Sequence, residues 1–164
     1  MPCCRVPFFD LNPYDFPPRP DHMATILQIA DSVTAQLNAA QISQPLSAKR
    51  LYVPNFDLQD VTELRVSVVP RELFIMAYDR TASKYSARID VAIQKKFEHG
   101  TPEEIDPLVV LIEEIADLFR LKRLDSMPEA RCVSVEHPVI YSTEHWEQHR
   151  TFTSLLTLAF QMAR

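Results

Sequence analysis

The sequence contains a single glycine, Gly100, among 164 residues. Phosphate-binding loops, dinucleotide-binding turns and the sharp turns that carry nucleophilic serines need several glycines, because their backbone adopts positive φ or closely approaches a ligand. The sequence therefore predicts none of these sites. It contains no recognised catalytic motif, and we expect neither an enzyme activity nor a cofactor.

Cysteines are also few. Only Cys3, Cys4 and Cys132 occur, an odd number in which two are adjacent and none forms a C-x-x-C pair. This pattern favours neither a zinc site nor a disulfide framework, and it fits a reducing compartment. Because Cys132 falls within a predicted strand, we interpret it as a core residue rather than as a nucleophile with His137 as its base.

Long apolar runs and excess positive charge are absent as well. No apolar run approaches the roughly 18 residues that cross a bilayer, so the sequence predicts no transmembrane segment. The 17 Lys and Arg residues are outnumbered by 22 Asp and Glu residues, which gives a net charge of -5. This balance disfavours nucleic-acid recognition, which usually requires a basic face.

The charge is unevenly distributed along the chain. Residues 49–96 carry nine Lys and Arg against six Asp and Glu, whereas residues 97–125 carry three against eight. Such a separation of charge favours head-to-tail association between copies of one chain. The alternative interpretation is that the two segments form two solvent-exposed faces of the domain.

Prolines, by contrast, are abundant, and six of the 13 fall in residues 1–22. Proline fixes φ and removes a backbone donor, which excludes a helix or a central strand there. Interleaved aromatic residues favour an extended N-terminal arm that a partner chain covers. A disordered leader is the alternative, and the native start stays open between Met1 and Met23. The aromatic residues of the arm are Phe8, Phe9, Tyr14 and Phe16.

Hydrophobic periodicity predicts a single α+β domain over residues 23–164, with two helices packed on one mainly antiparallel sheet. The first helix covers residues 24–39, with Asp21 as its N-cap. The second begins at the capping sequence Thr101-Pro102-Glu103-Glu104.

Alternation with a period of two predicts the strands of this sheet. Pro70 is expected to end the second strand, because it cannot donate to a ladder. Residues 71–78 fit either a further strand or a packed loop. The predicted strands cover residues 49–53, 63–69, 84–97, 131–135 and 151–162.

One candidate metal site stands before the last strand, in the sequence His145-Trp146-Glu147-Gln148-His149. The two histidines are four residues apart, and Glu144 or His137 would add a third ligand. The sequence differs from the zinc-protease motif, because glutamate stands second after the first histidine rather than directly after it. We favour a solvated polar turn. A small metal-dependent enzyme is the alternative from a different functional class.

The assembled pattern resembles the tail-terminator (tail-completion) proteins at the head–tail junction of tailed bacteriophages. The resemblance covers about residues 23–164 and excludes the arm, which is not a usual part of the family pattern. It rests on the first helix and on four strings of sequence. These are Val68-Val69-Pro70, residues 88–96 (RIDVAIQKK), residues 108–117 (LVVLIEEIAD) and residues 152–158 (FTSLLTL).

The resemblance implies a small α+β structural protein of the virion, assembled in the host cytoplasm. It implies a ring, typically a hexamer, that ends polymerisation of the tail tube protein and docks the tail to a head-completion or neck protein. A head-completion or neck adaptor at the same junction is the nearest alternative, and an accessory host protein with a peptide-binding edge strand stays open.

Three groups of residues are the predicted contacts between copies. The arm supplies its four aromatic residues, and the second long strand supplies a basic end. The second helix supplies an acidic face. The predicted basic and acidic residues are Lys95, Lys96, Glu113, Glu114 and Asp117.

Overall fold

The computed structural model describes residues 24–53 and 63–164. The predicted α+β class is confirmed in these residues: helices pack on one five-stranded sheet of order β1-β2-β3-β5-β4. Strand β1 is parallel to β2, and the other neighbours are antiparallel. The elements are α1 (Thr25–Ala39), β1 (Ala48–Arg50), β2 (Arg65–Ala77), β3 (Ser83–Lys96), α2 (Pro102–Phe119), β4 (Arg131–Val139), α3 (Thr143–His149) and β5 (Thr151–Ala163).

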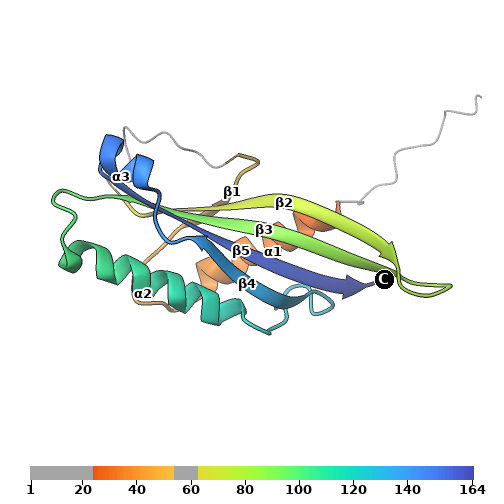
Figure 1. Cartoon of the computed structure of the whole chain (residues 1–164). Helices are drawn as coiled ribbons and strands as arrows, with labels where there is room; N and C mark the ends of the chain where they lie inside the picture. The colour runs from red at the N-terminus through yellow and green to blue at the C-terminus, as the bar shows by residue number, and fades with distance from the viewer. Residues whose placement is uncertain (1–23, 54–62) are drawn as a thin grey trace, which may run out of the picture.

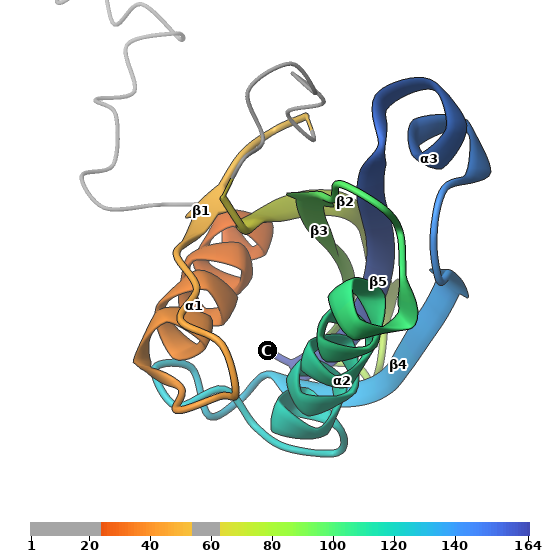
Figure 2. The ribbon, with the colours of Figure 1, turned by 90° about the vertical axis from the view of Figure 1, so that its left-hand side faces the viewer.

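The sheet curves around the two long helices, as the end-on view of Figure 2 shows. Helix α1 packs against β1 and β2, whereas α2 packs against β5 and β4. The short helix α3 lies at one end of the long sheet, and the turn between β2 and β3 lies at the other (Figure 1). The concave face of the sheet therefore holds the core, and the two ends carry different structures.

Strand β3 forms the centre of this core. It pairs with β2 on one side and with β5 on the other along its length. Ile89 and Val91 face the helices and are fully buried, and their cross-strand partners Leu158 and Leu156 extend the same apolar layer. The predicted alternation of β3 and β5 is therefore confirmed, because cross-strand partners share one face of a sheet.

Helix α2 begins where the capping sequence predicts, with Pro102 at its first position. The Glu104 carboxylate accepts hydrogen bonds from the backbone N–H groups of His99 (3.0 Å) and Gly100 (2.8 Å). These two bonds, that of His99 first, lower the pKa of Glu104. A glutamate in the first turn thus ties the helix start to the preceding turn.

Gly100 is the single glycine, and its position requires one. Its φ is +69°, and an added Cβ would lie 3.0 Å from both Phe97 Cε2 and Trp146 Cζ2. The rings of Phe97 and Trp146 themselves pack with centroids 4.3 Å apart. Close packing of α3 on the turn before α2 therefore depends on the missing side chain.

Strand β2 is longer than predicted, and the prediction that Pro70 ends it is wrong. The strand continues to Ala77 through a bulge in which Pro70 lies opposite Ile89 and Glu72 opposite Arg88, so that Arg71 is the extra residue. Strand β1 pairs only with Val66–Val68. Pro70 therefore lies on an edge, where a missing N–H is tolerated. Residues 71–77, left open above, are strand.

Other predictions at the start of the domain have different outcomes. Helix α1 has Ala24 as its N-cap and no side-chain capping bond, so the predicted cap by Asp21 is wrong. Strand β1 is shorter than predicted and ends at Arg50. Residues 1–22, the predicted arm with Phe8, Phe9, Tyr14 and Phe16, lie outside the described residues.

The buried face of α2 gives a prediction about stability, and the exposed residue next to a buried one provides its control. Leu111 is completely buried, whereas Val110 is 48% exposed. We expect Leu111→Ala to lower the free energy of unfolding by about 2–5 kcal/mol, because it removes buried methyl groups and leaves a cavity. Val110→Ala should change it by less than about 0.5 kcal/mol. Denaturant titration measures both, and equal losses would contradict this packing.

Candidate functional site

Beyond the bulge, β2 and β3 form a hairpin that exposes large apolar side chains. We call Phe74, Ile75, Met76 and Tyr78 the hairpin surface; each is between 54% and 65% exposed. Phe74 and Met76 lie on the convex face of the sheet, and Ile75 lies on the concave face. Because exposed apolar side chains stand on both faces, the hairpin extends beyond the part of the sheet that the helices cover.

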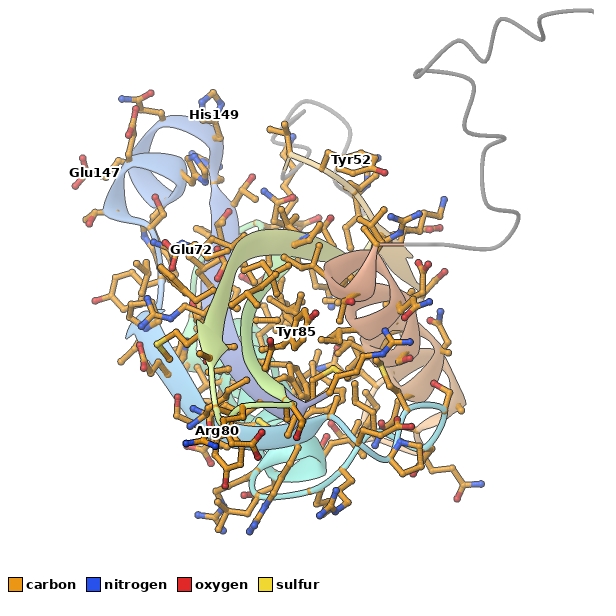
Figure 3. The ribbon with its side chains drawn as sticks, turned by 90° about the vertical axis from the view of Figure 1, so that its right-hand side faces the viewer. Tyr52, Glu72, Arg80, Tyr85, Glu147 and His149 are labelled. Atoms are coloured by element: carbon orange, nitrogen blue, oxygen red, sulfur yellow. The ribbon has the colours of Figure 1, made fainter. Side chains whose placement is uncertain are left out.

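The two faces of the hairpin are visible from its own end of the molecule in Figure 3. Tyr85, the cross-strand partner of Ile75, points into the space inside the curved sheet, whereas Glu72 and Arg80 lie outside it. Among the described residues, no strand lies beyond β2 after the segment that β1 covers. The hairpin therefore offers apolar side chains together with an open strand edge.

The tip of the hairpin is held in one conformation. Oδ1 of Asp79 accepts hydrogen bonds from the N–H of Thr81 (2.7 Å), its hydroxyl (3.0 Å) and the N–H of Ala82 (2.8 Å). These bonds, the Thr81 N–H first, lower the pKa of Asp79. Ser83 and the C-terminal Arg164 exchange backbone hydrogen bonds of 2.7 and 2.9 Å. A surface already ordered in this way loses little entropy when it binds.

The charged groups at the base of the hairpin have partners within the chain. Arg71 pairs with Asp90 (3.5 Å) and Arg88 with Glu72 (3.4 Å). Thr157 also donates a 2.7 Å hydrogen bond to Asp90. The polar base is thus satisfied internally, and the apolar side chains toward the tip are the part of the hairpin without a partner surface.

The predicted basic contacts, Lys95 and Lys96, end β3 and point to opposite faces of the sheet. Lys95 lies opposite Phe152 and lines an open hollow with Leu46 and Leu64, whereas Lys96 lies opposite Thr151. Neither lysine forms an ion pair with a described residue. Their role between copies stays a prediction.

The predicted acidic contacts on α2 are not equivalent. Glu114 accepts hydrogen bonds from the Ser43 hydroxyl (2.7 Å) and N–H (2.9 Å), which lower its pKa and tie the segment after α1 to α2. Asp117 pairs with Arg120 at 3.5 Å on the helix surface. Glu113 is exposed. Glu114 thus has a partner inside the chain, and contacts of the three residues between copies stay a prediction.

The His145 to His149 segment is helix α3, so the predicted polar turn is wrong. The Ser142 hydroxyl caps it by accepting from the N–H of His145. The ring centroids of His145 and His149 are 6.4 Å apart, and Nδ1 of His145 lies 3.0 Å from the Thr153 hydroxyl oxygen. In residues 24–53 and 63–164, no group of three or more His, Cys, Asp or Glu side chains is arranged to hold a metal ion.

Of the two residues proposed as the third ligand, Glu144 is exposed in the first turn of α3, and His137 contacts another residue. Its Nε2 lies 2.7 Å from the hydroxyl of Ser154, which donates in turn to the carbonyl oxygen of Val139 at 3.1 Å. Burial lowers the pKa of His137. Because Ser154 is completely buried and its hydroxyl proton goes to a carbonyl, this pair stabilises the end of β4 and is not arranged for nucleophilic attack.

Cys132 is a core residue, as predicted. Its side chain is completely buried, and burial raises the pKa of the thiol to about 11. Since the thiolate is the reactive form of cysteine, this site is unsuited to nucleophilic catalysis.

Sequence reasoning missed the hairpin surface. The available signal was the run Leu73-Phe74-Ile75-Met76-Ala77-Tyr78, which is apolar without alternation and stands before the polar turn Asp79-Arg80-Thr81. A strand buried on both faces gives the same pattern, so the sequence alone did not distinguish burial from exposure.

The comparisons with known proteins add no family assignment. No protein-family profile matches the sequence, and no curated protein shows significant similarity to it. None of the described helices has both the length and the apolar composition needed to cross a membrane.

The Ser43–Glu114 contact predicts a specific pH dependence. The folded pKa of Glu114 lies below its ordinary value of 4.5, so its contribution to stability is present above that value and is lost as the pH falls through the lowered pKa. We expect Glu114→Gln to lose less stability than the unchanged protein between about pH 5 and pH 3. Urea midpoints across this range measure the difference, and identical pH profiles would contradict it.

The burial of Cys132 predicts that its thiol reacts slowly with alkylating reagents. In a Cys3→Ser/Cys4→Ser variant, we expect a maleimide at neutral pH to leave Cys132 unmodified in the native protein and to modify it fully in denaturant. Intact mass measured over time records both rates. Rapid modification of the native variant would show that Cys132 is accessible and ionised.

Proposed function

We propose that this protein is a structural component of a phage head–tail junction. It acts there as a tail terminator that assembles into a ring at the end of the tail tube. The observation that carries the proposal is the hairpin surface. Four large apolar side chains stand exposed on a preorganised hairpin. Large apolar side chains exposed together on one element in this way are typical of a protein–protein contact.

The use of the other candidate groups supports a function through contact rather than through chemistry. Cys132 belongs to the core, His137 contacts Ser154, and His145 contacts Thr153. Three of the residues that the sequence offered for catalysis or metal binding, Cys132, His137 and His145, therefore have structural surroundings of their own. The α+β class of the described residues is also the class that the resemblance to tail terminators implies.

In the proposed ring, each copy contacts its neighbours through unlike surfaces, because a ring requires a heterologous interface that closes. One side of the ring faces the tail tube protein, and the other faces the head-completion or neck protein. The protein acts in the virion and requires no substrate or cofactor for this role.

The decisive experiment is the mass and shape of the purified full chain. Native mass spectrometry and electron-microscopy class averages should show a closed ring, with six copies for a tail terminator. A ring of twelve copies would favour the neck adaptor instead. A chain that stays monomeric at micromolar concentration, or that forms open filaments only, would overturn the proposal.

The hairpin surface gives a variant test of the same proposal. We expect Phe74→Asp/Met76→Asp to reduce the fraction of chains in rings at least tenfold, because it places charge in the apolar contact. Leu121→Asp is the control, since it also adds a carboxylate at an exposed apolar site, and Leu121 lies outside the hairpin surface and outside the predicted contact residues. Native mass spectrometry reports assembly, and circular dichroism checks folding. Equal assembly of both variants would show that the hairpin surface does not contribute to the interface.

A further inference from the structure

A second exposed apolar surface lies at the opposite end of the sheet. It consists of Val139, Ile140 and Tyr141, which connect β4 to α3 and are 38%, 53% and 52% exposed. We call these three residues the β4–α3 surface. The turn between β2 and β3 and helix α3 mark the two ends in Figure 1. Exposed apolar side chains therefore gather at both ends of the sheet in the part of the chain that the structure describes.

The β4–α3 surface is also held in place. The ring of Tyr141 packs on Trp146 with centroids 5.5 Å apart. The backbone N–H of Ser142 donates to the carbonyl oxygen of Thr153 at 2.9 Å, which fixes the segment to β5. Like the hairpin tip, this segment is ordered without a partner and is prepared for binding.

The charges around the two surfaces have opposite signs. Residues 136–147 carry the carboxylates of Glu136, Glu144 and Glu147 and contain no Lys or Arg. The hairpin surface is flanked by Arg80 and Lys84 and by one carboxylate, Asp79, which accepts hydrogen bonds from its own turn and keeps its charge, so residues 79–84 carry a net charge of +1. None of these three carboxylates and two cations forms an ion pair with another described residue. An apolar centre with a charged rim is the usual anatomy of an interface.

We propose that the hairpin surface of one copy binds the β4–α3 surface of the next copy. This inference rests on the proposed ring and specifies its interface. One contact of this kind covers both apolar surfaces and brings opposite charges together. A contact between two hairpin surfaces would instead oppose Arg80 and Lys84 to themselves, and it would leave the β4–α3 surface exposed.

The position of the two surfaces has a consequence for assembly. After one contact forms, the pair of copies still has one free hairpin surface and one free β4–α3 surface. Further copies add until the first and last copies meet and the ring closes. A contact between identical surfaces would stop at a dimer.

The test uses two variants that each lose one surface. Phe74→Asp disrupts the hairpin surface, and Ile140→Asp disrupts the β4–α3 surface. For each variant alone, the fraction of chains in assemblies should be at least tenfold lower than for the unchanged chain. An equimolar mixture should give a heterodimer, because each variant supplies the surface that the other has lost. That heterodimer cannot extend, since its remaining surfaces are the disrupted ones. Native mass spectrometry with one variant isotope-labelled distinguishes it from homodimers.

The controls keep the outcomes separate. Leu121→Asp should form rings like the unchanged chain, and circular dichroism verifies the fold of every variant. If Phe74→Asp does not fold, Met76→Asp replaces it, and if Ile140→Asp does not fold, Val139→Asp replaces it. If the unchanged chain forms rings but the mixture stays monomeric, or if Ile140→Asp assembles normally, the inference is wrong while the ring proposal stands. If the unchanged chain forms no ring, the proposed function fails first.

Discussion

The structure depends on the pairing of β3 with neighbours on both sides. Because β2 and β5 bond to β3 along its length, its alternation sets which face of all three strands carries apolar side chains. Ile89, Val91 and Ile93 therefore place an apolar layer on the concave face, and α1 and α2 bury against that layer. Beyond the bulge at Arg71, the pairing carries β2 and β3 past the helices, where their side chains are no longer covered. The pairing of β3 with its neighbours therefore determines both the buried core and the exposed hairpin.

The sequence predicted the elements in which periodicity and packing agree. Strands β3 and β5 alternate cleanly, and α2 combines an apolar stripe with the Thr101-Pro102 start, so local pattern was sufficient there. Pro70 and α3 were predicted wrongly for tertiary reasons. Pro70 is tolerated because β1 ends before it, and α3 is held by Ser142 and by its packing over Gly100. The end of β1 and the packing over Gly100 are not visible in a local window of sequence, whereas the Ser142 cap is a local signal that the prediction missed.

The candidate site shows a similar division. Cysteine and histidine positions stand out in a sequence, yet their chemistry depends on neighbours that only the fold supplies. Burial of Cys132 and the contact between His137 and Ser154 convert reactive residue types into structural ones. The residues that support the proposed function are ordinary apolar ones. Phe74 and Ile140 receive their proposed role because the fold leaves both side chains exposed, one in the hairpin of β2 and β3 and the other between β4 and α3.

The bulge at Arg71 divides β2 into two segments that respond differently to substitution. Before it, Val66 and Val68 are buried in the core, and substitutions there cost stability. After it, the side chains of the hairpin surface contribute little to the core, so changes among them leave the domain folded. One strand thus joins a segment that determines stability to a segment that can be changed without unfolding the domain. The proposed contacts of the hairpin can therefore be altered separately from the fold.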